Sequence, residues 1–185
     1  MALAITSLPR NPSRAQGLGL ALAGAALITL GAKIQIPFWP VPMTLHTLSV
    51  FLVALTLGPR LGLAAMAAYL GAGAAGLPVF SGTPERGIGL SYMVGPTGGY
   101  LLGYLVAAGL TGWLAMGRGW IGRVLAMLAG LAVVYAGGLA WLSLFVPAPK
   151  LLAAGLTPFL LGDLIKVLLA ATLMSGLSRL KGRDQ

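Results

Sequence analysis

Two charged residues near the C-terminal end, Asp163 and Lys166, have the types and spacing to bind a polar small molecule. They interrupt an apolar run over residues 160–173, and Asp163 is one of only three acidic residues in the chain. Three residues apart on a helix, the two side chains share one face about one turn from each other. If this run crosses a bilayer, each charge costs about 2.5 to 3.5 kcal/mol at the centre, so the pair needs a reason to be there.

Two interpretations of the pair are open. The carboxylate can accept N–H groups of a ligand while the ammonium donates to a ligand carbonyl or acid. Alternatively, the two charges neutralise each other as an internal ion pair. Because well-packed apolar residues are often at least as stabilising as a buried ion pair, the ligand-binding interpretation is favoured.

The composition is that of an integral membrane protein. Of the 185 residues, 58% are hydrophobic and only 8% charged, and the mean hydropathy is +0.93. A soluble domain carries about 25% charged residues. Because one crossing takes about 20 apolar residues, the chain suits about six spans with short loops in a single domain over residues 1–185. The absence of cysteine excludes disulfides, thiol nucleophiles and cysteine-bound metals.

Apolar runs and their breaks predict an all-α bundle of six transmembrane helices. Three prolines between residues 37 and 42, and Gly-Pro-Arg at 58–60, end the helices around them. The stretches 36–44 and 77–96, rich in proline or glycine, are predicted to be irregular. The helices are expected at about 15–34, 45–57, 61–76, 97–116, 121–145 and 158–177.

Basic residues at the predicted helix ends define a topology. With six spans both termini share one side, which collects eight basic residues against two, Arg86 and Lys150, on the other. The positive-inside rule then predicts cytoplasmic termini in a multi-pass protein of the plasma membrane. The same distribution explains the net charge of +9 without a nucleic-acid-binding patch. The eight are Arg10, Arg14, Arg60, Arg118, Arg123, Arg179, Lys181 and Arg183.

This topology places the irregular stretches 36–44 and 77–96 outside, above helices too short to span the membrane. Irregular backbone at membrane depth is tolerated only where it is buried in protein or lines a cavity. Asp163 lies five residues into the helix predicted from residue 158, on the same side. Together these features predict an outward-facing pocket for a small molecule, lined by Phe38, Trp39, Phe80, Tyr92 and Tyr100.

Three other polar residues near the predicted pocket are weaker candidates. Thr44 is expected to cap the helix that follows it and also to face the pocket. His46, the single histidine, can either line the pocket or cap the helix, and the structural role is favoured. Arg86 is expected to be a solvated loop charge.

The chain lacks the residues that enzymes and pumps need. No histidine follows Ser91, so Gly-Leu-Ser at 89–91 has no base to activate a serine nucleophile. No phosphate-binding loop and no cluster of metal ligands is present in the sequence. We therefore expect no enzymatic activity, no cofactor and no metal. Capture of a small molecule with energy from a partner is favoured over a stand-alone ion-coupled carrier, which usually has several intramembrane acids.

Four spaced motifs then follow one another along the chain. They are Pro-Val-Pro-Met-Thr-Leu at 40–45, Gly-Leu-Pro-Val-Phe at 76–80, Gly-Pro-Thr-Gly-Gly-Tyr at 95–100, and Asp163 with Lys166. The set resembles the BioY family, the biotin-binding S components of energy-coupling-factor (ECF) transporters. The resemblance implies the six-helix S-component fold, cytoplasmic termini and a biotin site near the extracellular face. It also implies partnership with a transmembrane coupling protein and two ABC-type ATPases.

By the same resemblance Asp163, Lys166 and Tyr100 are pocket residues, together with Ser81. Asp163 is expected to accept a ureido N–H of biotin and Lys166 to meet the ureido carbonyl, while Trp39 and Tyr100 cover the rings. An S component for another vitamin is the alternative function within this class.

A ridge of small residues on the first helix, Gly17, Ala21 and Ala25, is spaced by four residues and suits close helix contact. The contact is either internal or with a partner. The resemblance implies that Ala21 and Ala25 contact the coupling protein. It also shows one departure, because family members usually carry Gln where this chain has His46.

Overall fold

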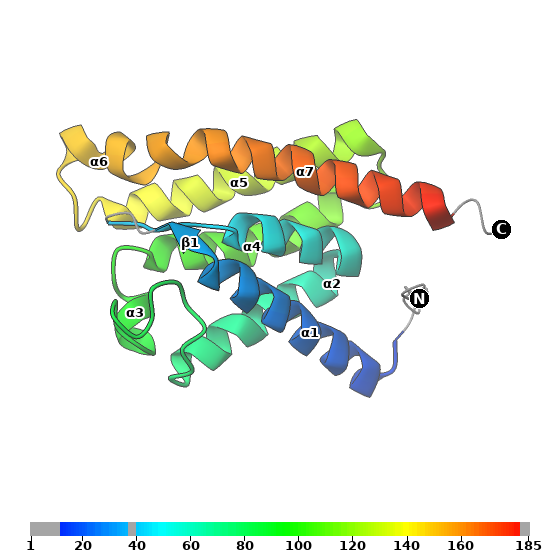
Figure 1. Ribbon diagram of the computed structural model, residues 1–185, viewed down its shortest axis with the longest axis horizontal. Coiled ribbons are helices and arrows are strands. Elements are labelled where there is room, and N and C mark those ends of the chain that lie inside the picture. The colour runs from blue at the N-terminus through cyan, green and yellow to red at the C-terminus, as the bar shows by residue number, and fades with distance from the viewer. Residues whose placement is uncertain (1–11, 37–39, 182–185) are drawn as a thin grey trace.

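The computed structural model describes residues 12–36 and 40–181. Within them the elements are α1 (Arg14–Lys33), β1 (Gln35–Ile36), β2 (Met43–Thr44), α2 (His46–Ala74), α3 (Leu90–Met93), α4 (Gly98–Leu114), α5 (Trp120–Leu142), α6 (Ala148–Gly155) and α7 (Thr157–Lys181). The long helices lie side by side (Figure 1). The start of α1 and the end of α7 lie at one end of the molecule, and α3 and α6 lie at the other.

Helix α1 packs closely on α2 through the small residues of its inner face. A Cβ placed on Gly24 would lie 2.8 Å from the Cβ of Ala65 in α2. The side chains of Ala21 and Ala25 are 4% and 9% exposed, and Ala25 belongs to the same core cluster as Ala65. Both side chains therefore pack inside the chain, and their contact with a coupling protein stays a prediction.

Helix α2 consists of two halves that meet at Gly58. Its φ of 77° is disfavoured for a residue with a Cβ, and Pro59 has no N–H to continue the helical hydrogen bonds. The chain turns back here, at the end of the molecule where α1 begins (Figure 1). A Cβ on Gly62 would lie 3.2 Å from the Cα of Ala54, whereas eight residues of straight helix rise about 12 Å. The break predicted at 58–60 corresponds to this turn.

Helices α4 and α5 also approach through glycine. A Cβ on Gly103 of α4 would lie 2.8 Å from the Cα of Val134 on α5, so a larger residue at 103 would separate the helices. Helix α4 also packs on α2, and α7 packs against both α2 and α5. This arrangement leaves α2, α4, α5 and α7 around a common centre.

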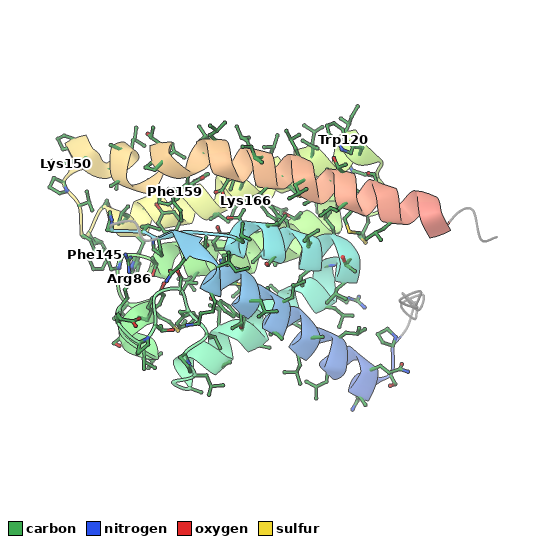
Figure 2. The ribbon with its side chains drawn as sticks, viewed as in Figure 1. Arg86, Trp120, Phe145, Lys150, Phe159 and Lys166 are labelled. Carbon is green, nitrogen blue, oxygen red and sulfur yellow. The ribbon has the colours of Figure 1, made fainter. Side chains whose placement is uncertain are left out.

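The outer surface of the bundle is apolar. Among the described residues, four helical segments are long and apolar enough to cross a membrane, and the apolar α4 is shorter at 17 residues. Their outward side chains include Leu161, which is 71% exposed, and an apolar surface of this extent fits lipid rather than water. Figure 2 shows Arg86 and Lys150 near the end formed by α3 and α6, whereas Trp120 lies toward the opposite end.

The structure departs from an all-α fold at one point. Strands β1 and β2 pair in antiparallel fashion, with Gln35 opposite Thr44, so the ends of the stretch predicted to be irregular form a short ribbon. The pairing gives hydrogen-bond partners to backbone N–H and C=O groups, which lipid cannot provide. The stretch 77–96 likewise contains α3, and α6 occupies most of the gap predicted between residues 145 and 158.

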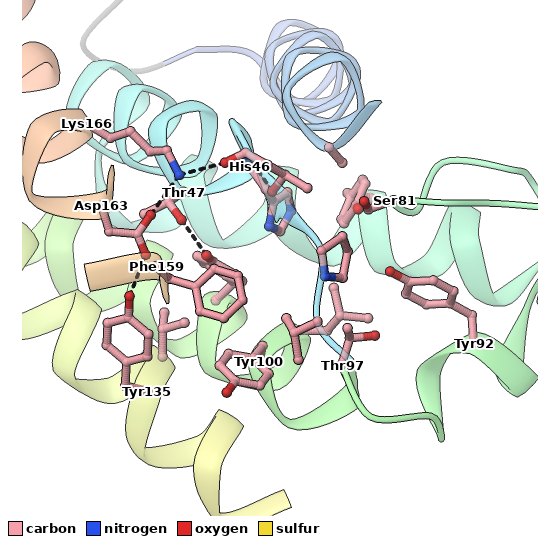
Figure 3. A pocket seen from close by; sticks show the side chains of 18 residues that line it. His46, Thr47, Ser81, Tyr92, Thr97, Tyr100, Tyr135, Phe159, Asp163 and Lys166 are labelled. Carbon is pink, nitrogen blue, oxygen red and sulfur yellow. Dashed lines mark hydrogen bonds and ion pairs between the residues drawn. The ribbon is translucent and has the colours of Figure 1, made fainter. Parts of the chain in front are cut away.

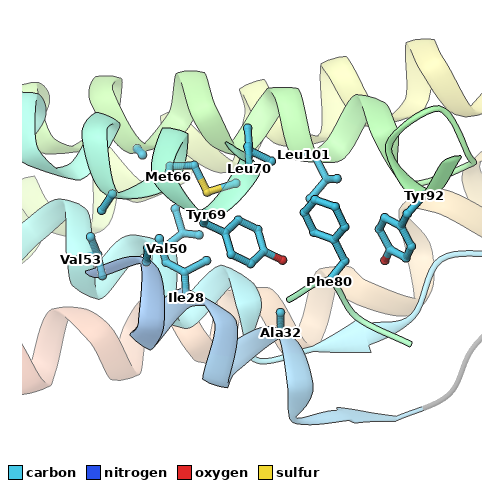
Figure 4. Packing of buried hydrophobic residues seen from close by; sticks show 13 residues of the cluster. Ile28, Ala32, Val50, Val53, Met66, Tyr69, Leu70, Phe80, Tyr92 and Leu101 are labelled. Carbon is cyan, nitrogen blue, oxygen red and sulfur yellow. The ribbon is translucent and has the colours of Figure 1, made fainter. Parts of the chain in front are cut away.

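Aromatic rings fill the core near α3 (Figure 4). Tyr69 and Phe80 meet edge to face with ring centroids 5.4 Å apart, and Phe80 stacks on Tyr92 at 4.8 Å. The side chain of Phe80 is fully buried. Phe80 therefore anchors the loop after α2 in the core, which corrects its predicted place in a pocket wall.

Candidate functional site

A cavity lies between α2, α4, α5 and α7, with residues 41–44 along one wall (Figure 3). The empty space inside it is about 600 Å³, including solvent at its open mouth. The wall is mainly aromatic and apolar, with polar groups at two ends.

The ion pair of α7 forms the first polar end. The Lys166 ammonium donates to Asp163 Oδ1 at 2.8 Å and to the backbone carbonyl of Thr44 at 2.7 Å. The Tyr135 hydroxyl, on α5, donates to Asp163 Oδ2 at 2.7 Å. This network ties α7 to α5 and to the segment before α2.

The pair retains bonding capacity in the cavity wall. An ammonium has three N–H donors, of which Lys166 uses two, and each carboxylate oxygen of Asp163 can accept a further bond. The internal ion pair is therefore observed, and ligand binding by the same pair stays a prediction. The pair still offers a donor and acceptors to a ligand.

Two tyrosines of α4 supply aromatic walls, and their hydroxyls are bonded within the protein. The Tyr100 hydroxyl donates to the backbone carbonyl of Gly155 at 2.7 Å, and its ring packs so closely on Gly138 that a Cβ there would overlap it. Tyr104, one helical turn later, shares a hydrogen bond of 2.5 Å with the hydroxyl of Thr47. The internal bonds fix the two rings in place.

Hydroxyl groups form the second polar end. Figure 3 shows Ser81, Tyr92 and Thr97 on the side of the cavity away from Asp163. The Ser81 hydroxyl donates to the side-chain oxygen of Gln35. Burial raises the pKa of Tyr92 above its ordinary value, so its hydroxyl remains a neutral hydrogen-bonding group.

Two basic side chains hold the loops together near this second end. The Lys33 ammonium donates to the Thr83 hydroxyl at 2.7 Å and to the Thr83 carbonyl at 3.3 Å. The Arg86 guanidinium donates to the backbone carbonyl of Pro40 at 3.2 Å. Arg86 was expected to be a solvated charge, but it is half-buried and joins the two loops.

His46 lies in the wall between the two polar ends (Figure 3). Its side chain is buried, with its ring centroid 4.5 Å from that of Tyr104 and 5.2 Å from that of Tyr69. Its Nε2 has no hydrogen-bond partner among the residues that the structure describes. The backbone N–H of His46 is satisfied by the Thr44 hydroxyl at 3.2 Å, next to the first turn of α2.

Six of the residues predicted to line the pocket or to bind the ligand line this one cavity. They are Thr44, Ser81, Tyr92, Tyr100, Asp163 and Lys166. Trp39, predicted to cover the ligand rings, lies outside the described residues. The structure therefore brings together residues from segments more than 100 positions apart in sequence, such as Thr44 and Lys166.

Sequence reasoning missed three residues that build the site. Tyr104 follows Tyr100 by four positions, so helical spacing could have placed both on one face. Thr47 and Tyr135 carry isolated polar groups in apolar helices, and nothing in their local sequence indicates which partner each will meet. Their roles depend on contacts with α4 and α7.

Comparisons with known proteins agree with this geometry. A family model described as the BioY family matches residues 6–183. A protein of Pyrococcus horikoshii named "Probable biotin transporter BioY" is 38% identical over 169 residues, covering 91% of this chain and 98% of that protein. The "Biotin transporter BioY" of Thermotoga maritima is 42% identical over 158 residues, covering 84% of this chain and 92% of that protein.

A solved structure is also similar. The crystal structure of the S-component for biotin from an ECF-type ABC transporter superposes with a TM-score of 0.78 at 27% sequence identity. The match covers 91% of this chain and 95% of that one. With its motifs, its cavity and these similarities, the chain belongs to the BioY family.

Proposed function

We propose that this protein captures biotin as the substrate-binding S component of an energy-coupling-factor transporter. The observation that carries the proposal is the Asp163–Lys166 pair in the wall of a mainly aromatic and apolar cavity. It is supported by relatives that are named biotin transporters and by the similarity to a biotin S-component.

The chemistry of biotin matches the two polar ends. Its ureido group has two N–H donors and a carbonyl, and its carboxylate lies at the far end of an apolar ring and chain. In our proposal Asp163 accepts a ureido N–H, and the third N–H of Lys166 donates to the ureido carbonyl. The rings of Tyr100 and Tyr104 flank the apolar part.

The carboxylate of biotin is assigned to the end near Ser81. Next to Asp163 it would meet a like charge, which is unfavourable in a partly buried site. Near Ser81 the basic side chains of Lys33 and Arg86 hold the neighbouring loops and contribute positive potential.

We also propose six membrane spans with both termini in the cytoplasm of a plasma-membrane protein. The six are α1, the two halves of α2, α4, α5 and α7. The turn within α2 and the connection from α4 to α5, which carry Arg60 and Arg118, lie at the end where α1 begins and α7 ends. Figure 2 shows Arg86 and Lys150 toward the other end. This asymmetry supports the orientation by the positive-inside rule.

Energy for uptake is assigned to partner proteins. The sequence has no phosphate-binding loop with which the chain could hydrolyse ATP itself. In our proposal the chain is a binding subunit, without resident cofactor, that works with a transmembrane coupling protein and two ABC-type ATPases. A stand-alone ion-coupled carrier is the competing possibility. Uptake of biotin into liposomes only after the coupling subunits and ATP are added is the expected result, and uptake driven by an ion gradient alone would favour the carrier.

Binding itself is tested by calorimetric titration of the purified protein. We expect saturable one-to-one binding of biotin and none of riboflavin or thiamine at the same concentrations, because only biotin presents a ureido group to the ion pair. Tight binding of another vitamin with no heat from biotin would replace this proposal by an S component for that vitamin.

Replacing Tyr100 by Phe is expected to leave biotin affinity within about threefold of the wild type, because the hydroxyl bonds Gly155 and not the ligand. The lost internal hydrogen bond is expected to lower the free energy of unfolding by about 1 kcal/mol. Titration calorimetry and thermal unfolding measure the two effects. A large loss of affinity in a protein of unchanged stability would mean that the hydroxyl contacts biotin.

A further inference from the structure

A buried nitrogen in the cavity wall, His46 Nε2, has no hydrogen-bond partner in the part of the chain that the structure describes. Buried polar atoms in folded proteins are nearly always paired, so an exception calls for an explanation. The polar groups around it are paired within the protein. Tyr104 bonds Thr47, and Asp163 bonds Tyr135 and Lys166.

The protein itself offers no structural reason for an imidazole at this position. The N–H that starts α2 is served by the Thr44 hydroxyl, not by the side chain of His46. The ring packs between Tyr69 and Tyr104, as an apolar side chain of similar size would. What distinguishes histidine here is a polar atom in the wall of the cavity.

The imidazole also lies between the two polar ends of the cavity, beside the space that a bound ligand would occupy. Lys166 bonds the carbonyl of Thr44, two residues before His46, so the ring is close to the ion-pair end of the cavity. Figure 3 shows His46 between the Asp163–Lys166 pair and Ser81. A molecule that touches both polar ends therefore runs alongside the ring.

We propose that His46 is a ligand-contact residue whose Nε2 accepts the second N–H of the ureido group. The inference rests on the proposed function. Asp163 accepts one of the two ureido N–H groups and Lys166 donates to the carbonyl, which leaves one N–H without a partner. In the neutral imidazole with its proton on Nδ1, Nε2 is the acceptor, so the unpaired Nε2 and the unpaired ureido N–H satisfy each other.

The test compares His46→Leu and His46→Gln with the wild type by calorimetric titration of biotin. The Leu variant is expected to bind about 10-fold to 100-fold more weakly, because it leaves one ureido N–H buried without an acceptor. Its ligand-free melting temperature is expected to equal or exceed that of the wild type, because an unpaired buried group is removed. The Gln variant, whose amide oxygen is an acceptor, is expected to recover affinity to within about threefold.

A matched control is Thr56→Ala, on the same helix but outside the cavity, which is expected to bind like the wild type. If the wild type binds biotin and the Leu variant binds it equally well, the inference about His46 is overturned. The inference is also overturned if the Leu variant binds biotin more weakly, melts at a lower temperature than the wild type, and the Gln variant does not recover the affinity. That combination would give His46 a structural role only. A wild type that binds no biotin removes the proposed function instead, so the two failures are distinguishable.

Discussion

Replacing Lys166 by Met is expected to weaken biotin binding by at least about 100-fold and to lower the free energy of unfolding by about 3 to 5 kcal/mol. The ammonium is within 2.8 Å of Asp163 Oδ1 and 2.7 Å of the Thr44 carbonyl. Its removal leaves a buried carboxylate without a cation and takes away the donor assigned to the ureido carbonyl. Titration calorimetry and thermal unfolding in the same detergent measure both losses.

The matched control is Lys150→Met, which removes the same charge at an exposed position of α6. It is expected to leave both quantities unchanged. Wild-type affinity in the Lys166→Met variant would show that the pair does not contact biotin. Lost affinity with an unchanged free energy of unfolding would show that the folded protein tolerates the Asp163 carboxylate without the ammonium beside it.

Replacing Gly138 by Val is expected to weaken biotin binding by about tenfold or more and to destabilise the protein by about 1 to 3 kcal/mol. Even a Cβ at this position would overlap the Tyr100 ring, which forms a wall of the cavity. The ring must move, and its hydroxyl then leaves the carbonyl of Gly155. The effect arises through the shape of the cavity, because Gly138 has no side chain to contact a ligand.

The control for this substitution is Gly176→Val on α7, where an added Cβ meets no atom within 4 Å. Its affinity for biotin is expected to match that of the wild type. If the Gly138→Val variant binds biotin as tightly as the wild type in the same titration, the Tyr100 ring does not form the wall that the ligand contacts.

Features set by local sequence were predictable. The predicted helices 97–116 and 121–145 correspond to α4 and α5, because the apolar runs end at a turn where Gly117 has a φ of 68°. The Gly-Pro sequence at 58–59 marked the turn within α2. The spacing of Asp163 and Lys166 indicated one helix face, and the two charges are in contact there.

Features that depend on distant contacts were not predictable in this way. The ridge with Ala21 and Ala25 suits any close helix contact, and only the structure shows that both side chains are buried within the chain. Tyr135 joins Asp163 across 28 positions, and Lys33 joins Thr83 across 50. Nothing in the local sequence of His46 indicates that its Nε2 finds no partner among the described residues.

The central claim is that the Asp163–Lys166 pair is present to bind biotin, and the double variant Asp163→Leu with Lys166→Met tests it most directly. Replacing a buried ion pair by apolar residues of similar size is often neutral or stabilising, although here it also leaves the Tyr135 hydroxyl and the Thr44 carbonyl without their partners. This variant is therefore expected to fold and to lose less stability than Lys166→Met alone. In calorimetric titration we predict a biotin affinity at least about 100-fold below that of the wild type. A folded double variant that binds biotin as tightly as the wild type would contradict the claim.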